Sequence, residues 1–191
     1  MSNYCYTYQH TCKDGHDAYL LQNAPFKAAI KKSPNGKIKI PFLGEGYYFW
    51  EENIAAANRW GVKHYANKYR IVEYENLTIP EDSMLDLTNR RHINYFKELQ
   101  HIYIEKRPAC TNWPIGVWIQ FFKKLHLKNE VEFPFNNIKA DEHLPEKEKD
   151  EYDRGKTYFA DGLPYYTYLE PLYMLCIIDK KQMSFREKRL L

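Results

Sequence analysis

Residues 43–61 read LGEGYYFWEENIAAANRWG, a stretch in which two glycines lead into an aromatic run and then into an alanine-rich segment. Gly44 and Gly46 permit backbone angles or close approaches that a side chain would forbid. The aromatic run 47–50 has the composition of a short buried strand. Acidic and amide residues then supply a helix start, and the segment 54–60 reads as a helix that ends at the next glycine. The stretch therefore predicts a turn, a strand and a helix in that order.

This unit resembles the core of the ADP-ribosyltransferase fold of the poly-ADP-ribose polymerase type, in which a Gly-x-Gly-x-Tyr-Phe segment precedes a helix with a second aromatic residue. The resemblance implies that NAD is the substrate and that Gly46, Tyr47 and Tyr48 border its site. It also implies that Tyr48 stacks on the nicotinamide ring while Trp60 covers the other face. A planar cation between two aromatic rings gains roughly 0.5–2 kcal/mol beyond burial. Without the resemblance, the same pattern fits an edge strand that feeds a packed helix.

The chain as a whole is expected to form one domain. It has 191 residues and no Pro/Gly/Ser-rich linker, so it is long enough for a sizeable core. The resemblance implies an α+β, ADP-ribosyltransferase-like fold over residues 1–191, with two small packed antiparallel sheets that form an NAD cleft and with flanking helices. The net charge of +3 is too small to be a nucleic-acid footprint of the entire chain, although local basic patches remain compatible with it.

The sequence predicts a cytoplasmic protein with no membrane partner. No segment approaches the apolar length that spans a bilayer, and residues 1–4 lack a charged region followed by an apolar one. The four cysteines are far apart and form no Cys-x-x-Cys pair. Neither a disulfide framework nor a metal site is therefore predicted.

The N-terminal segment 4–11 alternates and is rich in tyrosine and threonine, which predicts a strand. Its end, Tyr8-Gln9-His10-Thr11, is similar to the Tyr-His-Gly-Thr pattern of the same family, where the histidine bonds the ribose of NAD and the following backbone holds the carboxamide. If Thr11 fixes the register, Gln9 replaces the histidine and His10 replaces the glycine. The resemblance thus implies that Gln9, His10 and Thr11 contact NAD, and glutamine can donate and accept hydrogen bonds as histidine does. An ordinary strand histidine at position 10 is the alternative.

A basic segment lies directly before the glycine pair. Residues 28–41 contain four lysines around Ser-Pro-Asn-Gly, which is a turn signal. Two interpretations stay open. The lysines could attract a pyrophosphate or the phosphates of a nucleic acid, or they could keep an exposed hairpin soluble.

Two helices are predicted in the middle of the chain. The first covers about 89–99, and the second lies within the aromatic segment 113–127. In the second helix, Val117, Phe121 and Leu125 share one stripe, so this stripe is expected to face the core.

The C-terminal part supplies the remaining candidate residues. The segment 141–157 is strongly charged and predicts an exposed, mobile loop, and 172–179 reads as a buried strand. The segment from Arg154-Gly155 through Asp161-Gly162 and a tyrosine-rich link to the strand 172–179 is similar to the end of some bacterial toxin-like transferases, with Asp161-Gly162 where that family has Glu-Gly. The resemblance places Met174 where the catalytic glutamate or glutamine of that family stands. Glu170, four residues earlier, is the nearest acid, so the expected catalytic set is Tyr48, Met174 and Glu170.

The resemblance implies a mono-ADP-ribosyltransferase that moves ADP-ribose from NAD to a macromolecular target, either protein or nucleic acid. Such an enzyme would act as a toxin or a phage-defence effector, with a neutralising antitoxin protein as a candidate partner. Two alternatives stay open. One is an NAD glycohydrolase on the same fold, and the other is a catalytically silent domain that binds ADP-ribose or nucleic acid.

Overall fold

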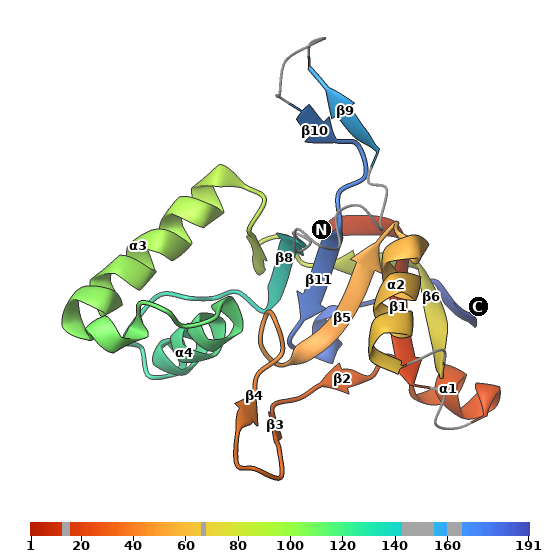
Figure 1. Ribbon diagram of the computed structural model, residues 1–191, viewed down its shortest axis with the longest axis horizontal. Coiled ribbons are helices and arrows are strands. Elements are labelled where there is room, and N and C mark those ends of the chain that lie inside the picture. Colours follow the sequence, from red (N-terminus) through yellow and green to blue (C-terminus); the bar gives the residue numbers. More distant parts are fainter. Residues whose placement is uncertain (13–15, 66–67, 143–154, 160–165) are drawn as a thin grey trace.

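A computed structural model describes residues 1–12, 16–65, 68–142, 155–159 and 166–191 (Figure 1). The described chain is an α+β domain built on an eight-stranded mixed sheet. Its strands lie in the order β12 (Glu187–Leu190), β6 (Tyr69–Ile79), β1 (Ser2–Cys12), β5 (Gly46–Glu51), β11 (Tyr173–Ile177), β8 (Asn137–Asp141) and β7 (Met84–Asp86), with β2 (Lys27–Ala28) beside β5. Only β7 and β8 pair in parallel among these strands.

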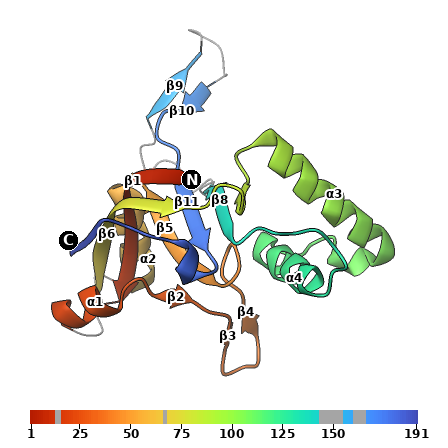
Figure 2. The same cartoon turned by 180° about the vertical axis from the view of Figure 1, so that it is seen from behind.

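The sheet turns back over itself as one eight-stranded mixed sheet, whereas the resemblance implies two small packed antiparallel sheets. The register of the ladder between β1 and β6 leaves out Cys5 and Asn76. Asn76 has a φ of 51°. Beyond this point the N-terminal end of β1 runs across the sheet (Figures 1 and 2). Tyr4 and Leu77 then share a core cluster with Leu175 of β11. Strands of one continuous hydrogen-bonded sheet therefore lie on both sides of this core.

Two hydrophobic cores lie on opposite faces of the sheet. The helical face carries Trp50, Met174 and Cys176, which pack with residues from the helices α2 (Ile54–Tyr65), α3 (Arg90–Lys106) and α4 (Ile115–Leu127). The strand face carries Phe49 and Leu175 beneath the ends of β1 and β6. Figures 1 and 2 show α3 and α4 beyond β8, on the far side of the sheet from α1 (Asp17–Asn23).

The predicted middle helices are present, but the buried stripe of α4 differs from the expected one. Trp118, Ile119 and Phe122 are buried together with Leu125, whereas Val117 and Phe121 keep part of their surface exposed. The reason is that α4 has aromatic neighbours on two sides. Phe122 meets Phe96 at 5.7 Å and Phe133 at 5.5 Å on the core side, while Phe121 meets Tyr103 at 5.1 Å and Trp113 at 5.4 Å.

Several short elements complete the described chain. They are the hairpin of β3 (Lys31–Lys32) and β4 (Ile38–Lys39), the hairpin of β9 (Lys156–Tyr158) and β10 (Tyr166–Tyr168), and the 3-10 turns η1 (Pro108–Cys110) and η3 (Lys180–Gln182). Most of the charged loop predicted over 141–157 lies outside the described residues. In the part that the structure describes, no helix has the length and apolar character required to cross a membrane.

The helix α2 continues through Gly61 to Tyr65, so the prediction that Gly61 ends it is wrong. The physical reason is a close contact rather than a terminus. A Cβ atom at position 61 would lie 2.4 Å from the Cδ2 atom of Tyr69, so only glycine lets this ring rest on the helix. The Tyr69 hydroxyl then donates a hydrogen bond of 2.9 Å to the Asn58 side chain.

We expect Gly61→Ala to destabilise the protein by about 1–3 kcal/mol through overpacking. The loss should appear even though alanine favours a helix by about 1 kcal/mol over glycine. Urea unfolding monitored by circular dichroism measures it. In a Tyr69→Ala background the same substitution should become neutral or stabilising, because the ring that obstructs the methyl group is gone. Equal losses in both backgrounds would contradict the contact.

Candidate functional site

The sheet opens between β1 and β5, where the candidate residues of both strands lie. These strands pair directly only at Thr7 with Glu51 and at Tyr8 with Trp50. Further along, β5 pairs with β2 instead, because Ala28 lies opposite Gly46. The opening therefore separates the end of β1 from the start of β5.

Gln9 bridges this opening. Its side-chain oxygen accepts a hydrogen bond of 2.8 Å from the Phe26 amide, and its nitrogen donates to the carbonyls of Phe26 at 3.1 Å and Tyr48 at 3.4 Å. The side chain is only 3 % exposed. The amide of Gln9 is thus bonded within the protein, and it holds β1, β2 and β5 at a fixed separation.

The backbones of His10 and Thr11 follow on the other flank of β1. His10 pairs with Ile71 and Thr11 pairs with Arg70 in the ladder with β6. Both positions therefore adjoin the start of β6, one strand away from Tyr48.

Gly46 has a packing role at the start of β5. A Cβ atom here would lie 2.5 Å from the Cys176 sulfur and 2.9 Å from the Ile177 carbonyl oxygen. Only glycine lets β5 pass this close to β11. The residue that the family resemblance assigns to the cofactor site thus also sets the spacing of two central strands.

Tyr47 and Tyr48 lie on opposite faces of β5. Tyr47 packs with the core of the strand face, and its ring centre lies 6.0 Å from the Lys180 ammonium. Tyr48 packs with the core of the helical face. Because α2 with Trp60 belongs to the helical face, only Tyr48 shares a side of the sheet with Trp60.

The Tyr48 hydroxyl closes the turn before β5. It accepts a hydrogen bond of 2.8 Å from the Leu43 amide and donates one of 2.6 Å to the Gly44 carbonyl. Burial, together with the neighbouring Cys176 thiol, raises the pKa of Tyr48 far above its ordinary value. Tyr48 is therefore a neutral phenol. Its ring is held at one end by the backbone of β5 and at the other by the hydrogen bonds of its hydroxyl.

Trp60 lies in an aromatic cluster on α2. Its ring is 6.1 Å from Trp50, 5.3 Å from Phe42 in an edge contact, and 4.1 Å from His64 in a stacked contact. Trp60 itself is partly exposed, whereas Trp50 is buried beneath it. The contact with Trp50 places α2 above β5, next to the row that contains Met174.

Met174 lies in this row on the helical face. It pairs with Trp50 on one side and with Ala140 on the other, and it is 7 % exposed. The adjacent row pairs Tyr48 with the fully buried Cys176, and burial raises the pKa of the Cys176 thiol to about 12. Met174 is thus a core residue on the same face as Tyr48 and Trp60.

Glu170 stands outside this arrangement. It is exposed, in the link between β10 and β11. Two residues later, the Leu172 amide donates a hydrogen bond of 3.0 Å to the Asp141 carboxylate, and the Leu172 carbonyl accepts one of 2.9 Å from the Glu142 amide. The structure therefore brings Tyr48, Trp60 and Met174 together but leaves Glu170 at the surface.

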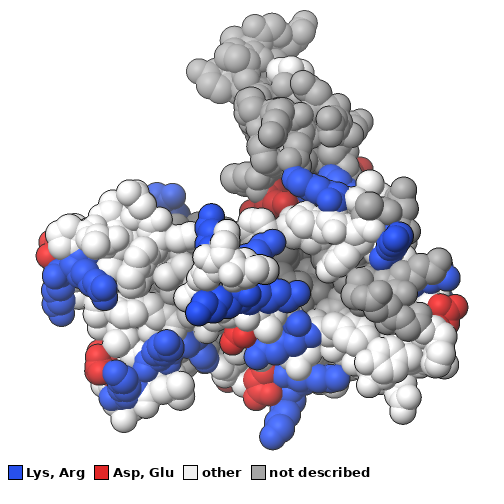
Figure 3. Space-filling view, turned by 60° about the horizontal axis from the view of Figure 1, so that its bottom comes forward, with Lys and Arg blue, Asp and Glu red and all other residues white. Residues whose placement is uncertain are grey.

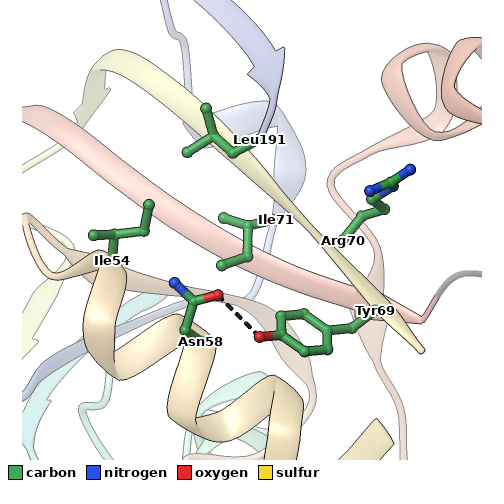
Figure 4. Close-up of a pocket in the computed structure, with 6 residues that line it drawn as sticks. All are labelled: Ile54, Asn58, Tyr69, Arg70, Ile71 and Leu191. Carbon is green, nitrogen blue, oxygen red and sulfur yellow. Dashed lines mark hydrogen bonds between the residues drawn. The ribbon is translucent and has the colours of Figure 1, made fainter. Parts of the chain in front are cut away.

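A pocket of about 370 Å³ lies between α2 and the start of β6 (Figure 4). Asn58 and Tyr69 are joined by their hydrogen bond on one wall, and Arg70 lies to the side towards α1, where its guanidinium is 3.6 Å from Asp17. The lining residues are Ile54, Asn58, Tyr69, Arg70, Ile71 and Leu191. Through the pairing of Arg70 and Ile71 with β1, this pocket adjoins the backbone of His10 and Thr11.

No protein-family model matches this chain, and comparisons with curated proteins and with solved structures found no significant match.

The sequence prediction missed the polar lining of the pocket. Residues 68–74 show a clear strand pattern, which indicates pairing but not that Tyr69 and Arg70 border a cavity. Asn58 sits in the predicted helix without any motif. The one local signal is Gly61, because a glycine inside a helix often marks a close contact with another element.

Proposed function

We propose that this chain is an ADP-ribosyltransferase-type domain that binds NAD and transfers its ADP-ribose to a macromolecular target. The observation that carries the proposal is the meeting of β5, α2 and the distant strand β11 on the helical face. Tyr48, Trp60 and Met174 surround Trp50, because Tyr48 is two residues from it, Trp60 contacts it and Met174 pairs with it. The family resemblance assigns these same positions to one NAD site.

The aromatic pair would hold the nicotinamide ring. The rings of Tyr48 and Trp60 pack on one core cluster, and the Tyr48 ring is held by its hydroxyl. A fixed aromatic face loses little freedom when a ligand stacks on it, so the stacking energy is retained in binding. Because the Gln9 amide is already bonded to Phe26, a ribose contact falls to its neighbours His10 and Thr11.

The pocket beside β6 would take another part of the dinucleotide. Its volume of about 370 Å³ falls in the range of small-molecule sites. Arg70 is the cation of its lining, and a guanidinium suits a pyrophosphate through paired hydrogen bonds. Asn58 offers an amide to a ribose hydroxyl.

Chemistry at the ribose requires stabilisation of positive charge as nicotinamide leaves. Met174 supplies none, so this role would pass to Glu170, moved in from the link before β11. Water in place of a macromolecular nucleophile would make the same site a glycohydrolase.

A second candidate function is favoured by the burial of Met174. An apolar residue that is 7 % exposed stands where the family resemblance calls for an acid. A domain of this kind would bind NAD or ADP-ribose without cleaving the bond to nicotinamide. The two proposals share the binding site and differ only in turnover.

One experiment separates these functions. The purified protein is incubated with NAD labelled in its adenylate part and with cell extract, and the products are digested with protease or with nuclease. Label in a macromolecule supports transfer, and the sensitivity of the labelled product identifies the acceptor class. Free ADP-ribose indicates hydrolysis. Intact NAD that still binds the protein supports the silent domain, and NAD that neither binds nor reacts overturns both proposals.

Trp60→Ala should weaken NAD binding by about ten-fold or more, the size expected when one stacking contact is lost. Isothermal titration calorimetry measures the dissociation constant. Trp60→Phe keeps an aromatic face and should recover part of the affinity. The matched control is Val62→Ala in the same helix, because this valine is 50 % exposed. If both alanine variants bind NAD as the wild type does, Trp60 does not border the site.

A further inference from the structure

A strongly basic surface lies at the end of the sheet where β2 leads into the hairpin of β3 and β4. We call Lys31, Lys32, Lys37 and Lys39 the lysine hairpin, and all four are exposed. No acidic residue occurs between Asn23 and Glu45 in the sequence. Figure 3 shows Lys and Arg side chains gathered across the middle of this face, with fewer Asp and Glu side chains between them.

The hairpin places like charges directly opposite each other. Lys31 pairs with Lys39 across the two strands, and like charges in this position destabilise a ladder. A two-stranded ribbon is also only marginally stable in water by itself. Within the described chain the four lysines form no ion pair. An anion that lies along the ribbon would remove this repulsion.

The turn of the hairpin is nonetheless well formed. The Ser33 amide and hydroxyl both donate to the Lys37 carbonyl, at 2.9 and 2.8 Å, and the Gly36 amide donates to the Ser33 carbonyl at 2.8 Å. At the base of the hairpin, the Glu45 carboxylate accepts a hydrogen bond of 2.9 Å from the Ile30 amide. The lysines are thus presented on an ordered ribbon, and the nearest carboxylate is engaged by the backbone.

The positive charge continues from the hairpin along β2. Lys27 pairs with Tyr47, and the ring of Tyr47 lies 6.0 Å from the Lys180 ammonium. Lys180 and Lys181 are exposed, and Asp179, the acid next to them, accepts a hydrogen bond of 3.0 Å from the Lys181 amide. The lysine hairpin, Lys27, Lys180 and Lys181 form what we call the basic track. It combines two segments that are far apart in the sequence.

An exposed aromatic ring follows the lysine hairpin in the sequence. Phe42 follows the hairpin by three residues and is 57 % exposed, and its ring meets Trp60 edge-on at 5.3 Å. This contact and the adjoining turn hold the ring in place. Proteins that bind single-stranded nucleic acid combine positive charge along the backbone of the strand with exposed aromatic rings on which bases stack, and this surface offers both groups.

We propose that the lysine hairpin, with Lys27 and Phe42, binds single-stranded RNA or DNA. The lysines would contact successive phosphates, and a base would stack on Phe42. The exposed aromatic ring favours a nucleic acid over an anionic membrane, because a base stacks on it whereas a lipid headgroup does not. This binding does not depend on NAD.

Fluorescence anisotropy with labelled 20-nucleotide RNA, DNA and duplex DNA tests the proposal over a series of salt concentrations. The test variant replaces the four lysines of the hairpin with glutamine. The matched control replaces four exposed lysines elsewhere with glutamine, Lys68, Lys97, Lys106 and Lys124. Both variants lose the same charge, so a difference between them reports the location of the site.

The wild type should bind single strands more tightly than duplex, with an affinity that falls steeply with salt. The hairpin variant should lose about 100-fold in affinity at low salt, and its log–log salt slope should shrink by about 0.7 for each phosphate contact removed. Phe42→Ala should lose about ten-fold with an unchanged slope. Equal affinities of the hairpin and control variants would overturn the proposal, and so would binding to phosphatidylserine vesicles without binding to oligonucleotides.

Discussion

Replacing Met174 with glutamate is expected to destabilise the fold by several kcal/mol, because an unpaired carboxyl group would enter the core of the helical face. Met174 is 7 % exposed and lies between Trp50 and Ala140 in the sheet. For a domain of this length, such a loss lowers Tm by about 10 °C or more. Met174→Leu keeps the volume and should cost less than about 1.5 kcal/mol.

The pH dependence of this variant supplies a second readout. Burial raises the pKa of an introduced carboxyl above its value of about 4.3 in the unfolded chain. Below that value the carboxyl is protonated in both the folded and the unfolded state, and the difference in free energy of unfolding between the variant and the wild type is smallest. As pH rises, the carboxyl ionises first in the unfolded chain, so this difference widens between about pH 4 and pH 8. Urea unfolding of both proteins at the two pH values measures it. A variant as stable as wild type at pH 8 would show that position 174 is open to solvent.

Tyr48 should be sensitive in stability as well as in NAD binding. Tyr48→Ala removes a packed ring and is expected to cost about 3–5 kcal/mol. Tyr48→Phe keeps the ring but leaves the buried Leu43 amide and Gly44 carbonyl without their partner, for a cost of about 1–3 kcal/mol. Sequence reasoning alone, which treats Tyr48 as a cleft residue, anticipates no stability loss.

The pair of Tyr48 variants also separates stacking from hydrogen bonding. If the ring stacks on nicotinamide, Tyr48→Phe should bind NAD nearly as the wild type does, while Tyr48→Ala should bind about 10- to 100-fold more weakly. Calorimetric titration at a temperature where both variants are folded measures this. Equal weakening in the two variants would assign the effect to the turn rather than to stacking. A Tyr48→Phe protein with wild-type stability would contradict the hydroxyl contacts.

The local elements of this fold can be predicted from sequence, because they follow from short-range patterns. The strand and helix after Gly46 and the core helix before Leu127 are present where periodicity indicates them. The long-range arrangement cannot be read in the same way. Nothing local to β11 specifies that it lies between β5 and β8, and the ladder between β1 and β6 is interrupted at Asn76, whose positive φ is only a weak signal in sequence.

The candidate site is predictable to a similar extent. Motif spacing correctly indicates that Tyr48 and Trp60 lie on adjoining elements, because the turn between strand and helix is short. It cannot show that the hydroxyl of Tyr48 is bonded to the turn or that the Gln9 amide is taken up by Phe26, since both partners are backbone groups. Because nearly every residue type supplies these backbone groups, the sequence does not reveal which of them accept or donate such hydrogen bonds.

The place of β11 has a consequence for how the chain folds during its synthesis. This strand joins the part of the sheet that holds β1, β5 and β6 to the part that holds β7 and β8, and it follows all of these strands in the sequence. Until the ribosome has released it, β5 and β8 each lack a partner on one edge, and such edges attract other chains. The two parts cannot be joined progressively from the N-terminus. We therefore expect a nascent chain that remains protease-sensitive and dependent on chaperones until β11 has left the ribosome.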